Sequence, residues 1–339
     1  MKPTILNSKG QPILLNEKEK RIAEQNQRVV NALGYEIDIT TLTTIVKKVT
    51  EQKFFEIAPA DYMPVRVGEG AWSSNLVTYR SFQLSDDFAT GVINTGGNSS
   101  RLAVGDAGVD SISVKVLNWA KQISWSLFDL ELAAKSGNWD LVTAKEKSRL
   151  RNFHLGIQKV AFLGLEGDSS AKGLYTQVGI TNNTTVIQKA ISDMDETELN
   201  ALLRALIEAY RSNCARTAFP THFIIPESDY NGLASVSSAT FPLKTKLQLL
   251  EEAMQLITRN KNFKILPCAY GDMAYNGLGV QKYALLNYDE ESLRMDIPVD
   301  YTNTLANSLD NFNFQNVGYA QFTGVQAYRP AELLYFTFD

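Results

Sequence analysis

The chain has 339 residues, 44% of them hydrophobic, so it is long enough for two domains or for one elaborate domain with a real core. Its 33 basic and 37 acidic residues give a net charge of -4, which does not indicate nucleic-acid binding through bulk charge. No run approaches the ~20 apolar residues of a membrane span, and the N-terminus lacks the apolar core of a signal peptide. Cys214 and Cys268 lie far apart without metal-ligand spacing, so we expect reduced core thiols in a protein that folds in the cytoplasm.

Residues 1–64 are predicted to form an arm rather than a domain. Asn16 and Glu19 have the spacing of a capping box, and a charged, weakly amphipathic helical pattern follows them until Gly34. A second weak helical pattern covers residues 42–53. Neither pattern has enough apolar surface to form its own core. The arm is therefore expected to lie on another surface, or else to be a flexible terminal tail.

Residues 65–115 predict a long β-hairpin. Residues 77–84 are rich in β-forming side chains, and residues 111–116 alternate between polar and β-branched side chains, so the two segments form an outgoing and a returning strand. The tip between them is polar and rich in glycine. An isolated two-stranded ribbon is marginal in water, so the outer part is expected to lie on a neighbouring subunit. The residues predicted to make this contact are Gly91, Asn94, Gly96, Gly97, Asn98, Arg101 and Gly105.

A long amphipathic helix is predicted over residues 138–165, with Asn138 as its N-cap. At ~1.5 Å per residue such a helix is roughly 40 Å long, more than a compact domain of ordinary size needs. One flank of the helix is basic, with Lys145, Lys147, Arg149 and Arg151. The apolar face is predicted to contain Leu141, Ala144, Leu150, Phe153, Ile157, Val160 and Ala161.

The chain becomes α/β in pattern from about residue 173 to residue 288. Residues 199–210 form a strongly amphipathic helix capped by Asp193 or Asp195, and residues 247–257 form another. Short apolar runs predict strands at residues 222–226, 263–266, 282–286, 293–299 and 333–338.

No catalytic, metal or cofactor site is expected. His154 and His222 lack metal-ligand spacing, and neither cysteine lies in a nucleophile signature. Gly96-Gly97 precedes neither a Lys-Ser/Thr pair nor a helix, which disfavours phosphate binding. The acidic run at residues 289–291 suits a turn better than a weak cation site.

The order of these elements resembles the major capsid protein of tailed bacteriophages, which has the Hong Kong 97 type of fold. The stretches that carry the resemblance are GAWSSNLVTYRSF, VKVLNWAKQISWSLFDLELAAKSGNWDL and GVQAYRPAEL. The resemblance covers nearly the whole chain, but it rests on element order and loose local patterns rather than on an invariant motif.

An α+β capsid fold with four parts is what this resemblance implies. The parts are an N-terminal arm (1–64), an extended loop (65–115), a peripheral domain (116–170 and 286–339) built on the spine helix 138–165, and an axial domain (171–285). Many relatives begin with a helical scaffolding segment that a protease removes. The arm is too short to contain one, so scaffolding is a separate protein or the chain is already trimmed.

The implied function is that of a structural, non-enzymatic subunit of an icosahedral or prolate phage capsid, assembled in the host cytoplasm and located in the virion. Its partners are other copies of itself, in hexameric and pentameric capsomers, with separate scaffolding, portal and decoration proteins as further candidates. Packaged double-stranded DNA is expected to make no sequence-specific contacts, and no membrane is involved. The alternatives are the shell of an encapsulin-like compartment and an α/β enzyme of unknown chemistry.

Overall fold

The computed structural model describes residues 56–83, 107–135, 140–168, 170–236, 244–308, 310 and 312–338. The chain divides into two units, Met1–Lys53 and Phe54–Asp339, and the architecture below is that of the second. The seven residues predicted to contact a neighbour lie outside the described residues, as do most of the predicted arm and the predicted cap Asn138.

One long strand, β3 (Ala107–Ser126), links two parts of a sheet. Its residues 107–115 pair with β2 (Asn75–Gln83), and its residues 116–126 pair with β11 (Asn313–Thr323). Both pairings are antiparallel, and the strand order is β10-β11-β3-β2, where β10 is Asn307–Ser308. A further strand, β9 (Val299–Asn303), also pairs with β11. The prediction that the returning strand ends at Val116 was wrong. No glycine or proline interrupts residues 109–126, so the strand continues for another ten residues.

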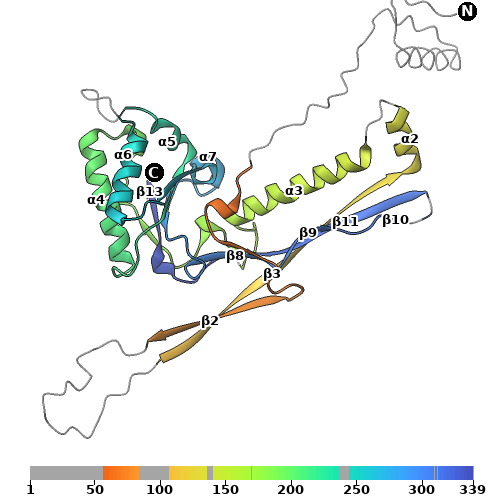
Figure 1. Cartoon of the computed structure of the whole chain (residues 1–339), viewed down its shortest axis with the longest axis horizontal. Helices are drawn as coiled ribbons and strands as arrows, with labels where there is room; N and C mark the ends of the chain where they lie inside the picture. The colour runs from red at the N-terminus through yellow and green to blue at the C-terminus, as the bar shows by residue number, and fades with distance from the viewer. Residues whose placement is uncertain are drawn as a thin grey trace, which may run out of the picture. The chain divides into compact units, whose positions relative to one another are not determined.

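Two helices follow β3, namely α2 (Leu127–Lys135) and α3 (Leu141–Leu163), and α3 runs alongside β3 and β11 (Figure 1). The N-cap of α3 is Asp140, whose side chain accepts a hydrogen bond from the Thr143 N–H, so the prediction of Asn138 was wrong. The C-terminal half of the predicted apolar face is buried, whereas Leu141, Ala144 and Leu150 are half-buried.

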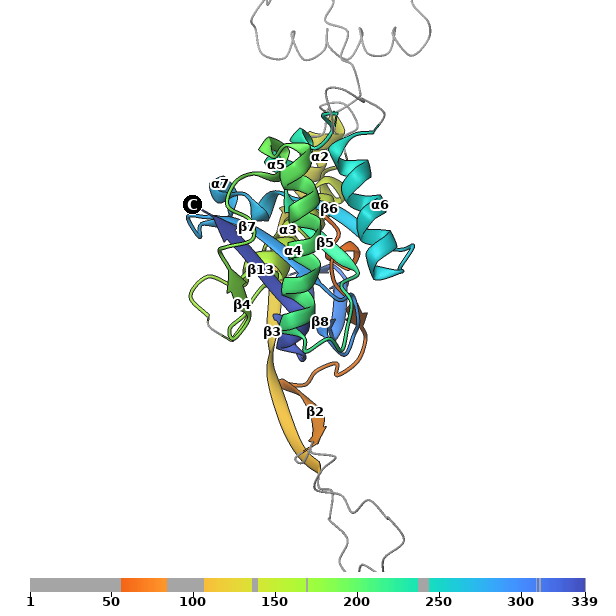
Figure 2. The same cartoon turned by 90° about the vertical axis from the view of Figure 1, so that its left-hand side faces the viewer.

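A second sheet has five strands, some parallel and some antiparallel, in the order β4-β13-β7-β5-β6. Two helices, α4 (Glu196–Asn213) and α6 (Lys246–Thr258), lie side by side in front of it (Figure 2). The strands are β4 (Thr181–Asn183), β13 (Leu333–Phe338), β7 (Gln281–Leu286), β5 (His222–Pro226) and β6 (Lys264–Cys268).

Both faces of this sheet are covered, which explains the uninterrupted apolar runs in its strands. In β5, Phe223 and Ile225 pack into the cluster that contains the buried face of α4, whereas Ile224 packs into the cluster that contains the C-terminal half of α3. The sheet therefore joins the two helical regions into one body.

The remaining elements are short. A three-stranded sheet in the order β1-β8-β12 consists of β1 (Val65–Val67), β8 (Leu293–Ile297) and β12 (Val325–Ala327). The short helices are η1 (Pro59–Asp61), η3 (Leu174–Thr176), η4 (Ile191–Asp193), α5 (Glu227–Gly232), η5 (Ala269–Gly271), α7 (Met273–Asn276) and η6 (Pro330–Glu332). None of the helices in the described part of the chain is long and apolar enough to cross a membrane.

Both edges of the five-stranded sheet are poor templates for a further strand. At one edge, β4 has three residues. At the other edge, β6 contains Pro267, which has no N–H to donate, and begins with the exposed Lys264. Short strands, proline and lysine are the usual means by which proteins keep sheet edges from pairing with other chains.

Candidate interaction surfaces

The surfaces exposed by the β2–β3–β11 sheet depend on how α3 is held against it. Arg149 is 1% exposed, and its guanidinium donates to the Tyr301 hydroxyl (2.8 Å), the Asn303 Oδ1 (3.0 Å) and the Asn316 Oδ1 (2.9 Å). It also donates to the carbonyl oxygens of Lys121 and Asn316. One side chain of α3 thus binds β3, β9 and β11, so Arg149 of the predicted basic flank is buried between the helix and the sheet.

Gly318 in β11 provides the space for this arginine. A Cβ atom at Gly318 would lie 2.7 Å from the Arg149 Nε and 2.8 Å from the Tyr301 hydroxyl, closer than real Cβ contacts. Nearer the C-terminal end of α3, Phe153 continues the contact with apolar packing, its ring lying 5.2 Å from Trp119 and 5.4 Å from Tyr301. Through these contacts α3 covers one face of the β3–β11 region.

The buried side of β3 changes from one end of the strand to the other. In residues 111–116, the even-numbered side chains face the protein, with Val114 and Val116 buried, and the odd-numbered ones are exposed. From residue 117 onward the odd-numbered side chains face α3 and are mostly covered, and the even-numbered ones are exposed up to Ser124. Since successive side chains of a strand point to opposite faces, the two ends of this strand present opposite faces of the sheet to solvent.

The exposed face of the β2–β3 ribbon carries large apolar side chains. Tyr79 is 74% exposed and stands opposite Ser111, while Val77 stands opposite Ser113 and is also exposed. Val109, paired with Ser81, adds a third exposed apolar side chain. This set, Val77, Tyr79 and Val109, is the ribbon face. Exposed aromatic and β-branched side chains on an edge ribbon favour contact with another surface.

The exposed face of the β3–β11 region is uncharged. Its side chains form amide contacts, including a 2.7 Å hydrogen bond from Gln321 Nε2 to Asn118 Oδ1 and another between Gln122 and Gln315. On this sheet face the β3 residues are exposed, the β11 residues other than Gln321 are half-buried, and Gln321 is buried; the set is Asn118, Ala120, Gln122, Ser124, Gln315, Val317, Tyr319 and Gln321. Uncharged amide, hydroxyl and aromatic side chains are cheaper to desolvate than charged ones, which favours burial against a partner.

Trp72 lies over this sheet face. Its indole is 5.8 Å from the Tyr319 ring and 71% exposed, and its backbone N–H donates to the Gln321 Oε1 at 2.8 Å. The φ angle of Trp72 is 64°, a left-handed conformation that a bulky residue adopts only when its surroundings impose it. An exposed tryptophan in a fixed position is a frequent centre of protein–protein contacts.

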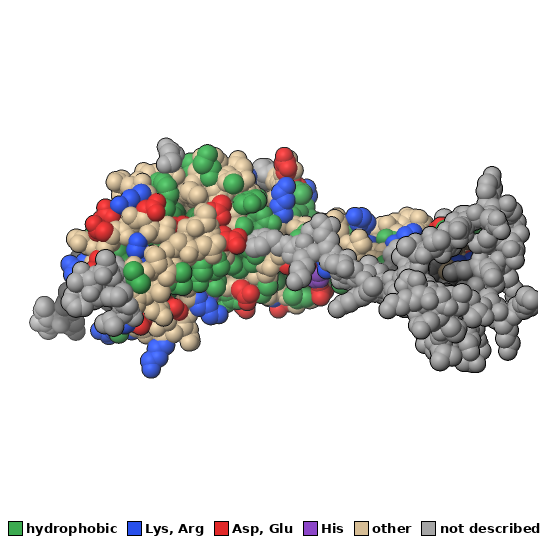
Figure 3. Space-filling model, turned by 90° about the horizontal axis from the view of Figure 1, so that it is seen from above, with side chains coloured by type: hydrophobic (Ala, Val, Ile, Leu, Met, Phe, Trp, Pro, Cys, Tyr) green, Lys and Arg blue, Asp and Glu red, His purple; other side chains and the backbone are tan. Residues whose placement is uncertain are grey.

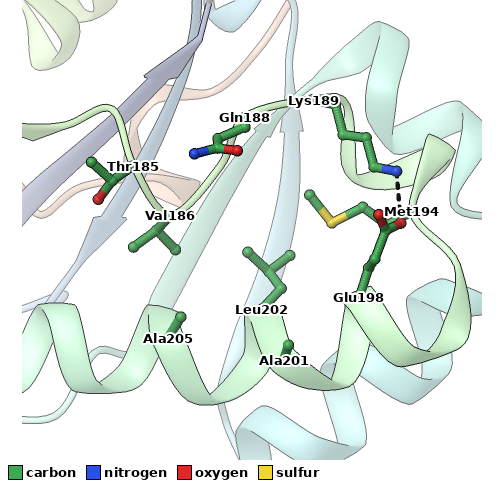
Figure 4. Close-up of a pocket in the computed structure, with 9 residues that line it drawn as sticks. All are labelled: Thr185, Val186, Gln188, Lys189, Met194, Glu198, Ala201, Leu202 and Ala205. Atoms are coloured by element: carbon green, nitrogen blue, oxygen red, sulfur yellow. Dashed lines mark ion pairs between the residues drawn. The ribbon is translucent and has the colours of Figure 1, made fainter.

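A surface groove lies beside α4 (Figure 4). It has a volume of about 530 Å³, and the two small side chains of Ala201 and Ala205 lie on its α4 side. Lys189 and Glu198 form an ion pair of 2.6 Å at one end. Its lining residues include no histidine or cysteine. On the face seen in Figure 3, acidic and basic side chains are interspersed rather than gathered by sign.

The cysteines, His154 and the acidic turn at residues 289–291 form no catalytic or metal-binding cluster in the described part of the chain. Cys214 and Cys268 are buried and free, as predicted. His154 is exposed on α3. At the turn of residues 289–291, Arg329 pairs with Asp289 (3.4 Å) and with Glu291, so a guanidinium provides the positive charge there. Among the described residues, no group of three or more histidine, cysteine or acidic side chains could hold a metal ion.

His222 is the titratable group with the clearest pH consequence. It is buried at the start of β5, its ring stacks on Tyr288 at 4.8 Å, and its Nε2 has no hydrogen-bond partner. Burial, with a smaller contribution from Lys264, lowers the pKa of His222 to about 4. Below pH 6.5 the unfolded chain therefore binds a proton that the folded protein does not, and stability falls as the pH drops toward 4.

We expect His222→Phe, which keeps the ring stacking on Tyr288, to reduce this loss of stability. Between pH 7 and pH 4.5 the wild type should lose about 2–3 kcal/mol more unfolding free energy than the variant. Thermal or denaturant unfolding at both pH values measures the difference. Equal losses in the two proteins would mean that His222 does not resist protonation.

A family model described as major capsid protein matches residues 92–338. The capsid of Myoviridae phage XM1 has a similar structure, with a TM-score of 0.67, 14% identity, and coverage of 88% of this chain and 99% of that chain. A search of curated proteins gives no match.

Two further solved structures are similar at low identity. Mycobacterium phage Bobi gives a TM-score of 0.54 at 10% identity and covers 90% of this chain and 99% of that one. A virus-like particle from Pyrococcus furiosus gives 0.50 at 13% identity, with 83% and 92% covered. These structural similarities confirm the predicted fold class.

Proposed function

Since the chain belongs to the major capsid protein family and is a structural capsid subunit, we propose that it self-associates into hexameric and pentameric capsomers that enclose double-stranded DNA. The observation that supports this most directly is the change of exposed side along β3. A subunit that exposes one face of a sheet at one end and the opposite face at the other end can overlap with its own copies.

The contact proposed between copies is an overlap of ribbon and sheet. The ribbon face points to the side on which α3 lies, and the sheet face points away from α3. A ribbon that extends beyond its own subunit can therefore lay its Tyr79 side on the Trp72 and Tyr319 side of the next copy. This contact is heterologous, and heterologous contacts repeat around a ring when the rotation between copies closes.

The predicted hairpin tip belongs to the same proposal. Gly91, Asn94, Gly96, Gly97, Asn98, Arg101 and Gly105 lie between the last paired residues of β2 and β3, Gln83 and Ala107. We propose that they extend the ribbon contact on the neighbouring subunit, and that the parts 1–64, 65–115, 116–170 with 286–339, and 171–285 act as arm, extended loop, peripheral domain and axial domain.

The proposed role of the protein is assembly rather than catalysis. The chain's net charge of -4 suits a container for DNA, because a strongly basic wall would hold the packaged polymer by counterion release. Separate scaffolding, portal and decoration proteins are proposed partners, with assembly in the host cytoplasm before the protein becomes part of the virion. No cofactor is part of the proposal.

Expression with the assembly partners of its own phage is expected to give closed shells of several hundred subunits or open sheets of capsomers. Electron microscopy of negatively stained particles and sedimentation velocity measure this. A concentration series with only monomer and dimer would contradict the proposal. Nuclease treatment and analysis of the particle contents distinguish a DNA container from a compartment that holds a protein cargo.

A further inference from the structure

A second apolar surface, separate from the ribbon, lies on α2 at the opposite end of β3. Phe128 is 74% exposed, Leu132 is 68% exposed, and Leu127 is partly exposed. Three large apolar side chains in contact with solvent within one nine-residue helix are unusual, because a helix at the surface normally turns its apolar side inward. We call Leu127, Phe128 and Leu132 the α2 patch.

The helix that carries the patch is fixed in position. The Ser126 N–H donates to the Asp129 carboxylate (3.0 Å), and the Asp129 N–H donates to the Ser126 hydroxyl (3.1 Å), which closes the N-terminus of α2 reciprocally. These hydrogen bonds lower the pKa of Asp129. The Phe128 ring also meets the edge of the Phe312 ring at 4.9 Å, and the Leu127 N–H donates to the Phe312 carbonyl. The patch is thus presented in a single orientation.

The charges beside the patch are complementary to those of a second copy. Phe128, Leu132 and Lys135 follow one another at positions i, i+4 and i+7 on the exposed side of α2, and Glu131 lies on the same flank as Lys135. If two copies of α2 cross antiparallel about a two-fold axis level with residue 133, the leucines at position 132 meet beside the axis. Glu131 of each copy then lies beside Lys135 of the other, so the same surface is complementary to itself.

We propose that the α2 patch binds the α2 patch of a second copy across a two-fold axis. This inference rests on the proposed function, because the area is small. The exposed parts of the three side chains amount to on the order of 300 Å², against ~800 Å² per partner in a stable complex. Such a contact is too weak to hold a free dimer, but it becomes effective when many copies are already joined, as in a shell.

The two contacts differ in symmetry, and together they can join subunits into rings and rings to one another. The heterologous ribbon contact repeats around rings, whereas a two-fold contact cannot form a ring and instead pairs one copy with one other. The α2 contact is therefore the contact that joins one ring to the next. Loss of the α2 patch should leave rings of subunits that fail to close into shells.

The direct test is Leu132→Cys, examined in assembled particles after mild oxidation. A residue beside a two-fold axis meets its own copy, so we expect disulfide-linked dimers, and no larger species, on a non-reducing gel. The native Cys214 and Cys268 are buried and do not compete. Leu256→Cys on α6 is the matched control, because Leu256 is 79% exposed but lies outside the patch. Shells of Leu132→Cys without dimers, or with as many dimers as the control, would overturn the inference.

Charge exchange tests the same contact without relying on a cysteine. Lys135→Glu should lower the yield of shells at least tenfold, and Lys135→Glu combined with Glu131→Lys should restore it, because the exchanged pair is again complementary across the axis. Circular dichroism and thermal unfolding of each variant confirm that the subunit is folded. Failure of the double variant to restore shells would overturn the self-pairing. If the wild type forms no rings or shells, the proposed function itself fails, and that result is distinct from normal shells built by Lys135→Glu, which would overturn only the α2 inference.

Discussion

A variant in which Gln83 is joined to Ala107 through an Asn-Gly turn is expected to fold and to form no shells. Gln83 and Ala107 are opposite one another at the end of the β2–β3 ladder, so a two-residue turn can close the shortened hairpin. The deletion removes residues 84–106, including the predicted contact residues at the tip, and shortens a long loop, whose closure costs entropy. If this segment lies on a neighbour, as proposed, the subunit core gains little from it.

Far-ultraviolet circular dichroism and thermal unfolding measure the folding of this variant, and sedimentation measures its assembly. Tyr79→Ser is the companion variant, since it leaves the tip intact and removes the largest side chain of the ribbon face. We expect fewer shells from Tyr79→Ser as well, with no loss of melting temperature. Normal shells from the deletion variant would show that the hairpin tip is dispensable, and an unfolded product would assign the tip to the subunit's own core.

The largest loss of stability is expected from Arg149→Ala, at about 3–5 kcal/mol of unfolding free energy. Every hydrogen bond that the Arg149 guanidinium makes to the described residues has a neutral acceptor on one of three strands. Truncation leaves the two buried acceptors of Asn316 without this donor, and it also leaves a cavity where a long side chain was. Arg149→Lys should recover only part of the loss, because an ammonium cannot reproduce the planar fork of donors.

Two further variants test whether the lost stability comes from the buried guanidinium contacts or only from the removal of a positive charge. Gly318→Ala keeps the arginine but places a methyl group 2.7 Å from its Nε, so it should destabilise the subunit by displacing the guanidinium. Lys159→Ala removes a positive charge from an exposed position of the same helix, where the lysine lies 3.8 Å from Glu166, and should cost less than about 1 kcal/mol. Equal denaturant midpoints for Arg149→Ala and Lys159→Ala would contradict the buried role of Arg149.

Much of the region that contains α4 and α6 could be predicted from the sequence, because the patterns that predict its helices and strands are local. Asp195, one of two proposed caps of α4, accepts from the Glu198 N–H. The apolar residues of its amphipathic pattern are all buried, namely Leu199, Leu202, Leu203, Leu206, Ile207 and Tyr210. Strand β13 has the predicted bounds. Each of these features follows from the periodicity or composition of a single segment, and no knowledge of the partner segment is needed.

The interaction surfaces were less predictable, because they depend on pairing between distant segments. Nothing near Arg149 distinguishes it from the neighbouring lysines, and its burial follows from residues about 150–170 positions away in β9 and β11. The conformation of Trp72 likewise depends on Gln321. The length of β3 depends on two different partners along one strand. The residues predicted at the hairpin tip lie outside the described part of the chain, so their contact stays a prediction.

The edges of the five-stranded sheet, which are poor templates for a further strand, affect how errors in shell assembly are corrected. Since neither the three-residue β4 nor the Pro267-containing β6 offers a good row of backbone groups, that sheet is unsuited to copies adding to one another by an endless backbone ladder. Contacts that copies make through this sheet are then limited to side chains, and weak side-chain contacts break readily before a particle is complete. A wrongly placed subunit can dissociate and bind again, so growth stays reversible until closure makes the many weak contacts act together.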